Sequence, residues 1–194
     1  HDALGLLMAR LILGTAQFGA GYGITNEAGR IDDRSMAEIV TAAQASGINT
    51  FDTAADYGDS QARLGLLPVS SDQLYVTKFS LPADSNEAIT AEVLFARSAR
   101  TLGVDVLDGV LFHRVADLAD PRCVEAVQVL LAARSSGTVR RVGASVYDVA
   151  DLELALSSFP ELDLVQIPGS IVDRRLLESS LVSELTKKGV EIHV

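Results

Sequence analysis

The sequence has one cysteine, three histidines, few basic residues and no long apolar run, and each shortage excludes a class of protein. A single cysteine, Cys123, cannot form an internal disulfide, which favours a reducing compartment, so we expect the protein in the cytoplasm. Cys123 lies in a helical pattern, where we expect it to pack rather than to react. No apolar stretch approaches the length that crosses a bilayer, and the first residues lack the basic segment of a secretion signal. We therefore expect no membrane association.

Basic residues are outnumbered along the whole chain. The 16 Lys and Arg residues stand against 26 Asp and Glu residues, which gives a net charge of −10 without a basic stripe. Nucleic acids are therefore not expected as partners. The histidines, His1, His113 and His193, form no pair with the spacing of metal ligands, so we expect no metal site. The glycine spacing of a phosphate-binding P-loop is absent as well.

Apolar residues make up 48% of the 194 residues, enough for one sizeable core. No linker, low-complexity segment or charge block divides them. We predict a single domain over residues 1–194, in which residues 1–8 are a tag remnant or an amino-terminal extension.

Short apolar runs alternate with longer helical patterns from end to end. Strands are predicted at residues 10–16, 49–54, 74–79, 106–113, 139–146, 162–168 and 190–194, and helices at 32–47, 86–103, 120–137, 148–159 and 174–189. Several helical patterns begin with Asp or Asn and end at Gly, as capped helices do. Strand and helix in alternation predict a parallel sheet with crossover helices.

Two α/β architectures fit this alternation: a doubly wound open sheet and a closed (β/α)8 TIM barrel. The first strand is followed by "LGTAQFGAGYG", which has no G-x-G-x-x-G leading straight into a helix, and this weakens the open sheet. Polar residues gather at the carboxyl ends of the strands, where barrels place their active sites. We predict an incomplete TIM barrel of about seven strands, with the eighth absent.

Four residues with complementary chemistry follow successive predicted strands. Asp52 ends the second strand, Lys78 the third and His113 the fourth, while Tyr57 lies in the loop after Asp52. In a barrel they would meet at one mouth and could transfer a proton to a carbonyl oxygen. A neighbouring ammonium stabilises a phenolate, so we expect Lys78 to make the proton of Tyr57 easier to give up.

Each of these residues also has a plain structural explanation when it is taken alone. An aspartate caps turns, a tyrosine decorates loops, a lysine pairs with surface acids, and a buried histidine hydrogen-bonds to the backbone. Four suitable side chains at consecutive strand ends are harder to attribute to chance.

At this point the chain resembles the aldo-keto reductases. The segments "LGTAQFG", "FDTAADYGDSQ", "VTKF", "LFH", "VGAS" and "VQIP" occur in the order and spacing of that family, from about residue 10 to residue 194. The longer "GTAQFGAGYGITN" is similar to a bacterial subgroup associated with sugar and surface-polysaccharide metabolism. The resemblance implies that Tyr57 is the general acid, and that Lys78, Asp52 and His113 complete a catalytic tetrad.

The resemblance also implies a nicotinamide cofactor, either NADPH or NADH, and a small-molecule aldehyde or ketone as the substrate, a class that includes sugars. By the same resemblance Ser145 and Gln166 hold the carboxamide of the nicotinamide, and Gly14, Thr15 and Asp52 lie on the cofactor side. Three positions depart from the family pattern: Val146 stands where an Asn is common, and Gly169 and Ser170 replace a bulkier residue and an Asn.

Two other functions are compatible with the same residues. One is a cofactor-binding regulatory or scaffold barrel without useful turnover, and the other is a lyase that uses Lys78 as a Schiff-base nucleophile. Whole barrels usually need about 250 residues, so we expect the chain to be a fragment of a longer protein or its ordered part, ending in or just after the seventh strand. Such a fragment would bind NADPH weakly and self-associate through its open sheet edges. The substrate, the choice of NADPH or NADH and the oligomeric state stay open.

Overall fold

Seven strands form one parallel sheet in the computed structural model, which describes residues 10–23, 26, 29–68 and 72–194. The strands pair in chain order, β1-β2-β3-β4-β5-β6-β7. Their bounds are β1 Ile12–Gly14, β2 Thr50–Asp52, β3 Leu74–Phe79, β4 Leu107–Phe112, β5 Val139–Ser145, β6 Leu164–Gln166 and β7 Glu191–His193. Each lies within a predicted strand. The segment 1–8, interpreted above as a tag remnant or extension, lies outside the described residues.

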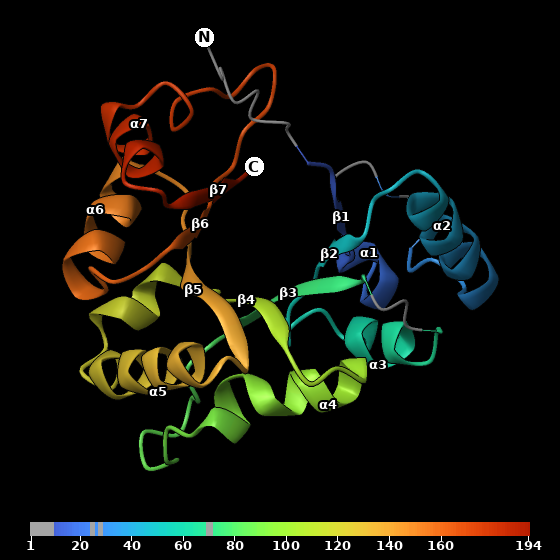
Figure 1. Ribbon diagram of the computed structural model, residues 1–194, viewed down its shortest axis with the longest axis horizontal. Coiled ribbons are helices and arrows are strands. Elements are labelled where there is room, and N and C mark those ends of the chain that lie inside the picture. The colour runs from blue at the N-terminus through green and yellow to red at the C-terminus, as the bar shows by residue number, and fades with distance from the viewer. Residues whose placement is uncertain (1–9, 24–25, 27–28, 69–71) are drawn as a thin grey trace, which may run out of the picture.

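The sheet curls into an open barrel rather than spreading flat. Figure 1 shows the strands as the inner layer, with the helices packed around their outer side. Strands paired in strict chain order, each returning through an outer helix, are the topology of a (β/α)8 barrel, because an open doubly wound sheet reverses its strand order. The predicted incomplete barrel of seven strands is confirmed, and β1 and β7 are the edges of the sheet.

The helices cover the outside of the barrel and differ in extent from the prediction. They are α1 Ala16–Gly19, α2 Asp33–Ala45, α3 Ser60–Gly65, α4 Arg97–Leu102, α5 Cys123–Ser136, α6 Val149–Ser158 and α7 Ser180–Lys187, with a π-helical turn η1 at Glu92–Ala96 and a 3₁₀ turn η2 at Val115–Ala119. The short helices α1 and α3 were not predicted. The patterns over 86–103 and 174–189 become helical only from Glu92 and Ser180. Among the described residues, no helix is long and apolar enough to cross a membrane.

The helix ends follow the chemistry of their capping residues. Asp32 accepts a hydrogen bond from the amide of Ser35 at the start of α2, and Asp148 does the same for the amide of Asp151 in α6. Both carboxylates satisfy an amide that has no partner within its helix. At its other end α5 stops at Gly137, whose φ of +80° is disfavoured for residues with a side chain.

Two apolar layers stabilise the barrel. Inside it, Val76, Leu111 and Leu164 form a small, fully buried cluster. Between strands and helices lies the main core, which includes the tilted pair Phe79 and Phe112, whose ring centroids lie 4.7 Å apart. Fully burying one such side chain contributes about 1.5 to 3 kcal/mol. These layers hold the strand ends, and thus the polar residues on them, in fixed relative positions.

Candidate active site

A buried ion pair lies at the carboxyl end of the second and third strands. Asp52 is the last residue of β2, and Lys78 is the last but one of β3. Lys78 Nζ donates to both carboxylate oxygens of Asp52, at 2.7 and 2.6 Å, and to the carbonyl oxygen of Thr53 at 3.2 Å. The exposed fractions are only 2% for Lys78 and 8% for Asp52. Two charges so far from water require each other, which explains the bidentate geometry.

The phenol of Tyr57 reaches this pair from the loop between β2 and α3. Lys78 Nζ lies 3.3 Å from Tyr57 Oη and 5.1 Å from the centre of its ring. The ammonium therefore connects a buried carboxylate to a partly exposed phenol. Among the side chains predicted for the site, these three meet through direct polar contacts.

Two glycines set the position of the Tyr57 loop against the first loop of the barrel. A Cβ atom on Gly19, at the end of α1, would lie 1.7 Å from the carbonyl oxygen of Tyr57. A Cβ atom on Gly58 would lie 2.4 Å from the carbonyl oxygen of Gly19, and the φ of Gly58 is +57°. Backbone packs directly on backbone here, which only glycine allows.

The electrostatics differ from what the sequence predicted for the phenol. Burial and the negative charge of Asp52 raise the pKa of Tyr57 above its ordinary value, and the phenols of Tyr22 and Tyr147 act in the same direction. Burial also lowers the pKa of Lys78, against the opposing effect of Asp52. Lys78 was expected to lower the pKa of Tyr57, but burial and the charge of Asp52 set the net direction, which is upward. Tyr57 therefore holds its proton across the physiological pH range.

His113 follows the last residue of β4, as predicted, and stands beside Tyr57. The two rings meet edge to face, with centroids 5.6 Å apart and an interplanar angle of 81°. The imidazole Nδ1 lies 3.2 Å from Oδ2 of Asp56, which also accepts a hydrogen bond of 2.7 Å from the Ser80 hydroxyl. The predicted tetrad is thus brought together, and a second carboxylate, Asp56, lies against its histidine.

Ser145 and Gln166 lie side by side at the same mouth. They are the last residues of β5 and β6 and are paired in the ladder, so their side chains extend from the same face of the sheet. Neither side chain hydrogen-bonds to another residue within the part of the chain that the structure describes. A hydroxyl and an amide that are free to donate and accept suit the carboxamide of a nicotinamide, which has both donors and an acceptor.

Gly14 and Thr15 lie where the first strand opens onto the mouth. A Cβ atom on Gly14 would meet nothing within 4 Å, so this position leaves free space next to Asp52, its partner in the ladder. Thr15 is fully buried, and its hydroxyl donates to the carbonyl oxygen of Asp52 at 2.9 Å while accepting from Ser60 at 3.1 Å. The Thr15 side chain therefore holds the site together, and the residue as a whole is buried beneath the mouth.

The predicted motifs coincide with the match to a known family. A model of the aldo/keto reductase family matches residues 10–194, which is nearly the whole chain. The chain belongs to this family. A comparison with curated proteins finds no match.

Solved structures of aldo-keto reductases have the same fold. A Pseudomonas aeruginosa protein assigned to these enzymes superposes with a TM-score of 0.74 at 25% identity, covering 95% of this chain and 71% of its own. The holo form of AKR11C1 from Bacillus halodurans superposes with a TM-score of 0.71 at 20% identity, covering 94% of this chain and 60% of its own. A Klebsiella pneumoniae aldo/keto reductase in complex with NADP and acetate superposes with a TM-score of 0.70 at 21% identity, covering 93% of this chain and 62% of its own. The chain thus spans 60 to 71% of the length of these relatives.

The departures from the aldo-keto reductase pattern have local structural reasons. Val146 is 1% exposed and packs in the main core, where an Asn would have to bury an amide. A Cβ atom on Gly169 would lie 2.5 Å from Val194 and 3.0 Å from Leu177, which occupy the space of a larger residue. The Ser170 hydroxyl accepts from the amides of residues 172 and 173 and so closes a turn.

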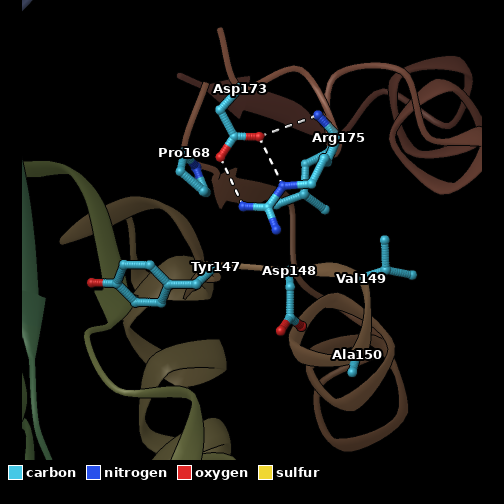
Figure 2. A pocket seen from close by; sticks show the side chains of 8 residues that line it. Tyr147, Asp148, Val149, Ala150, Pro168, Asp173 and Arg175 are labelled. Atoms are coloured by element: carbon cyan, nitrogen blue, oxygen red, sulfur yellow. Dashed lines mark hydrogen bonds and ion pairs between the residues drawn. The ribbon is translucent and has the colours of Figure 1, made fainter. Parts of the chain in front are cut away.

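A cavity of about 260 Å³ lies beside these strand ends, between the start of α6 and the loop after β6. It is lined by Tyr147, Asp148, Val149, Ala150, Pro168, Asp173, Arg175 and Leu176. Figure 2 shows the Arg175 guanidinium held by the Asp173 carboxylate, with hydrogen bonds of 2.9 and 2.8 Å. The phenol of Tyr147, which lines this cavity, is also one of the groups that raise the pKa of Tyr57.

Sequence reasoning missed Asp56, Ser80 and Tyr147. Each lies within two residues of a predicted site residue or follows a strand directly, and this position was the available signal. Their pairing could not be read from the sequence, because Asp56 and His113 are 57 positions apart. In the described residues, no group of three or more His, Cys, Asp or Glu side chains could hold a metal ion.

Proposed function

We propose that this chain is part of an NADPH-dependent reductase of aldehydes or ketones, sugars included, with Tyr57 as the proton donor. The observation that carries the proposal is the contact of one buried ammonium, Lys78 Nζ, with both Asp52 and the Tyr57 hydroxyl. A purely structural ion pair does not explain the contact with a phenol, and a tyrosine that only packs does not explain the contact with a buried lysine. The combination suits proton transfer at a carbonyl oxygen.

A nicotinamide cofactor, when bound, supplies the hydride, and the protein supplies orientation and the proton. The available hydroxyl of Ser145 and amide of Gln166 fit its carboxamide, as described above. The relative from Klebsiella pneumoniae in complex with NADP supports a cofactor of this kind, and NADH is the alternative.

Tyr57 is protonated before the reaction, because a phenol has an ordinary pKa near 10.0, and burial and the charge of Asp52 raise the pKa of Tyr57 further. An alkoxide is a stronger base than a phenolate, so an oxygen that acquires negative charge beside Tyr57 Oη takes this proton. The Lys78 ammonium, 3.3 Å away, then stabilises the phenolate that remains. Asp52 holds the ammonium in place and keeps it charged. Lys78 thus acts on the product side of the proton transfer.

The alternatives find less support in the geometry. A Schiff-base lysine must reach a carbonyl carbon, whereas the Lys78 side chain is 2% exposed and its Nζ already has four polar contacts. A scaffold barrel without turnover does not explain why a buried ammonium contacts a phenol.

An absorbance assay tests the proposal. The chain is mixed with NADPH, and separately with NADH, and offered a panel of small aldehydes, ketones and aldoses. Loss of cofactor absorbance at 340 nm that depends on the carbonyl compound supports the proposal. Cofactor binding without any turnover would favour the scaffold barrel. Borohydride trapping of a substrate on Lys78 would favour the lyase.

A further inference from the structure

Arg63 is a buried cation outside the tetrad. It lies in α3 and is 6% exposed, and among the residues that the structure describes Lys78 is the only other lysine or arginine that is buried. A guanidinium keeps its charge, so burying one costs free energy unless its hydrogen-bond donors find partners. The partners of Arg63 therefore show what its burial achieves.

The guanidinium of Arg63 binds two points of the segment between β1 and β2. Nη1 donates to the carbonyl oxygen of Phe18, the last residue but one of α1, where a carbonyl has no amide partner within its helix. Nε donates at 2.7 Å to Oδ1 of Asp33, in the first turn of α2, and Nη2 lies 2.6 Å from the same oxygen. One side chain thus joins α1, α2 and α3, which are separated in the sequence.

The Phe18 carbonyl lies next to the backbone contact that holds the Tyr57 loop. Gly19 follows Phe18, and its backbone lies so close to the Tyr57 carbonyl oxygen that no Cβ atom fits between them. The same oxygen accepts a hydrogen bond of 3.1 Å from the amide of Ser60, at the start of α3. Holding Phe18 to α3 therefore keeps α1 against the Tyr57 backbone.

The hydroxyl of Tyr57 is sensitive to a small displacement of this loop. It lies 3.3 Å from Lys78 Nζ, whereas the contacts of the same ammonium with Asp52 are 2.6 and 2.7 Å. The carboxylate holds the ammonium more tightly than the phenol does, so the position of Tyr57 depends on its own loop. A misplacement of about 1 Å can reduce a rate by about a hundredfold.

We propose that Arg63 is a positioning residue for Tyr57: it binds the Phe18 carbonyl and Asp33, holds α1 against the Tyr57 loop, and so keeps the phenol within reach of Lys78. Arg63 acts through the backbone of Gly19. The catalytic consequence rests on the proposed function, whereas the effect on the position of Tyr57 does not.

The position of Tyr57 can be followed without turnover. The chain has four tyrosines, Tyr22, Tyr57, Tyr75 and Tyr147, and incorporation of 3-fluorotyrosine gives each of them a fluorine-19 NMR signal. The signals of Tyr57 and of Tyr75, which is buried in β3, are assigned by their loss in Tyr57→Phe and Tyr75→Phe. In Arg63→Met we expect the Tyr57 signal to shift or broaden and the Tyr75 signal to keep its position.

Two control variants bracket this result. Arg30 pairs with Asp59, the residue before α3, but these side chains are 47% and 48% exposed, and such a surface pair contributes little. Arg30→Met should therefore keep the parental Tyr57 signal. In Gly19→Ala the added methyl group would collide with the Tyr57 carbonyl oxygen, so the Tyr57 signal should move at least as far as in Arg63→Met.

Turnover provides the second measurement. Per folded molecule, we expect Arg63→Met to lower kcat by roughly tenfold to a hundredfold, and Arg30→Met to leave it within about twofold of the parent. The Kd for NADPH should stay close to the parental value in both variants, because the predicted carboxamide contacts, Ser145 and Gln166, lie on other strands. An Arg63 that only stabilises the fold would lower the folded fraction and leave kcat per folded molecule and the Tyr57 signal unchanged.

The results that would overturn the proposal are specific. They are a folded Arg63→Met variant with the parental Tyr57 signal, or one with kcat within about threefold of the parent, far less than a misplaced phenol would cost. Loss of the Tyr75 signal would show that Arg63→Met does not fold. Arg63→Lys then replaces it, because an ammonium keeps the charge beside Asp33 but lacks the planar fork, and the same two results would overturn the proposal. A parent without turnover would refute the proposed function, while the fluorine signals would still show whether Arg63 positions Tyr57.

Discussion

Both ends of the barrel bury a carboxylate in the sheet, but they give it different partners. At the carboxyl end of the strands Asp52 faces one lysine that is itself buried and touches Tyr57. At the amino end Asp108, the second residue of β4, pairs with Arg140 at 3.3 Å and with Arg141 at 2.8 Å. These arginine side chains are 54% and 31% exposed, so their charges remain partly hydrated.

The difference lies in what else the cation can do. Arg141 also pairs with Glu191 at the start of β7, so the amino-end cluster connects β4, β5 and β7. The residues of the amino-end cluster pair only with residues on strands of the sheet. Lys78, by contrast, also contacts a phenol on a loop outside the sheet. In barrels the amino end serves stability and the carboxyl end serves catalysis, and four changes test whether this division holds here.

The largest effect is expected for Lys78→Met. The phenolate loses its stabilising charge, so turnover should fall by roughly 10²- to 10⁴-fold, and Asp52 remains buried without a partner, which costs about 3 to 5 kcal/mol of folding stability. Steady-state kinetics and urea unfolding measure the two losses. Arg140→Met, at the other end, is the control and should lower neither by a comparable amount, because its charge is half exposed. A Lys78→Met variant with turnover within threefold of the parent would contradict the assignment.

Tyr57→Phe should affect activity alone. The ring is retained and only the hydroxyl is lost, so the transferable proton disappears while packing changes little. We expect turnover to fall by roughly 10²- to 10⁴-fold, with the free energy of unfolding and the Kd for NADPH close to those of the parent. An absorbance assay measures the turnover, and cofactor titration by fluorescence measures the Kd for NADPH. Turnover within a few-fold of the parent would remove Tyr57 from the reaction.

Asp108→Ala should show the opposite pattern. The change removes the carboxylate that joins β4 to β5, and we expect a loss of about 1 to 3 kcal/mol in the free energy of unfolding. Turnover should stay within twofold of the parent, because the amino-end cluster has no contact with the mouth. Urea unfolding and steady-state kinetics are measured on the same preparation. A fall in turnover without a loss of stability would mean that the two ends are coupled.

The smallest effect concerns a second phenol, Tyr75, in the wall of the barrel. Burial raises its pKa to about 12 from an ordinary value of 10.0. The folded state therefore keeps a proton that the unfolded state releases, so this contribution to stability is complete below pH 10 and is lost between pH 10 and 12. Tyr75→Phe should make the free energy of unfolding fall less steeply over that window. An identical slope in both proteins would show that Tyr75 does not titrate there.

The strands could be read from the sequence because their apolar runs are short, β-branched and bounded by turn residues. The run 74–79 coincides with β3 from end to end. The short helices α1 and α3 could not be read, because four and six residues are too few for an apolar period to emerge. The helix predicted over 86–103 begins late, since its first residues lie in a turn-rich segment that the pattern alone cannot delimit.

For the site, the residue types and strand ends sufficed to bring Asp52, Lys78, Tyr57 and His113 together. The sequence could not predict whether the surroundings of Tyr57 raise or lower its pKa. The pKa of Tyr57 is raised first by burial and then by the charge of Asp52, and both depend on how the folded chain encloses the phenol. The contact between His113 and Asp56 could not be predicted either, because it also depends on the folded chain.

The glycine contact between the first loop and the Tyr57 loop limits how this protein can be altered. Position 19 is 38 residues before Tyr57 in the chain, yet any side chain there would collide with the Tyr57 backbone. Libraries that vary the first loop to change the cofactor or substrate should therefore leave positions 19 and 58 as glycine. Otherwise variants will lose activity by displacing the phenol, and the loss will be mistaken for a change in binding.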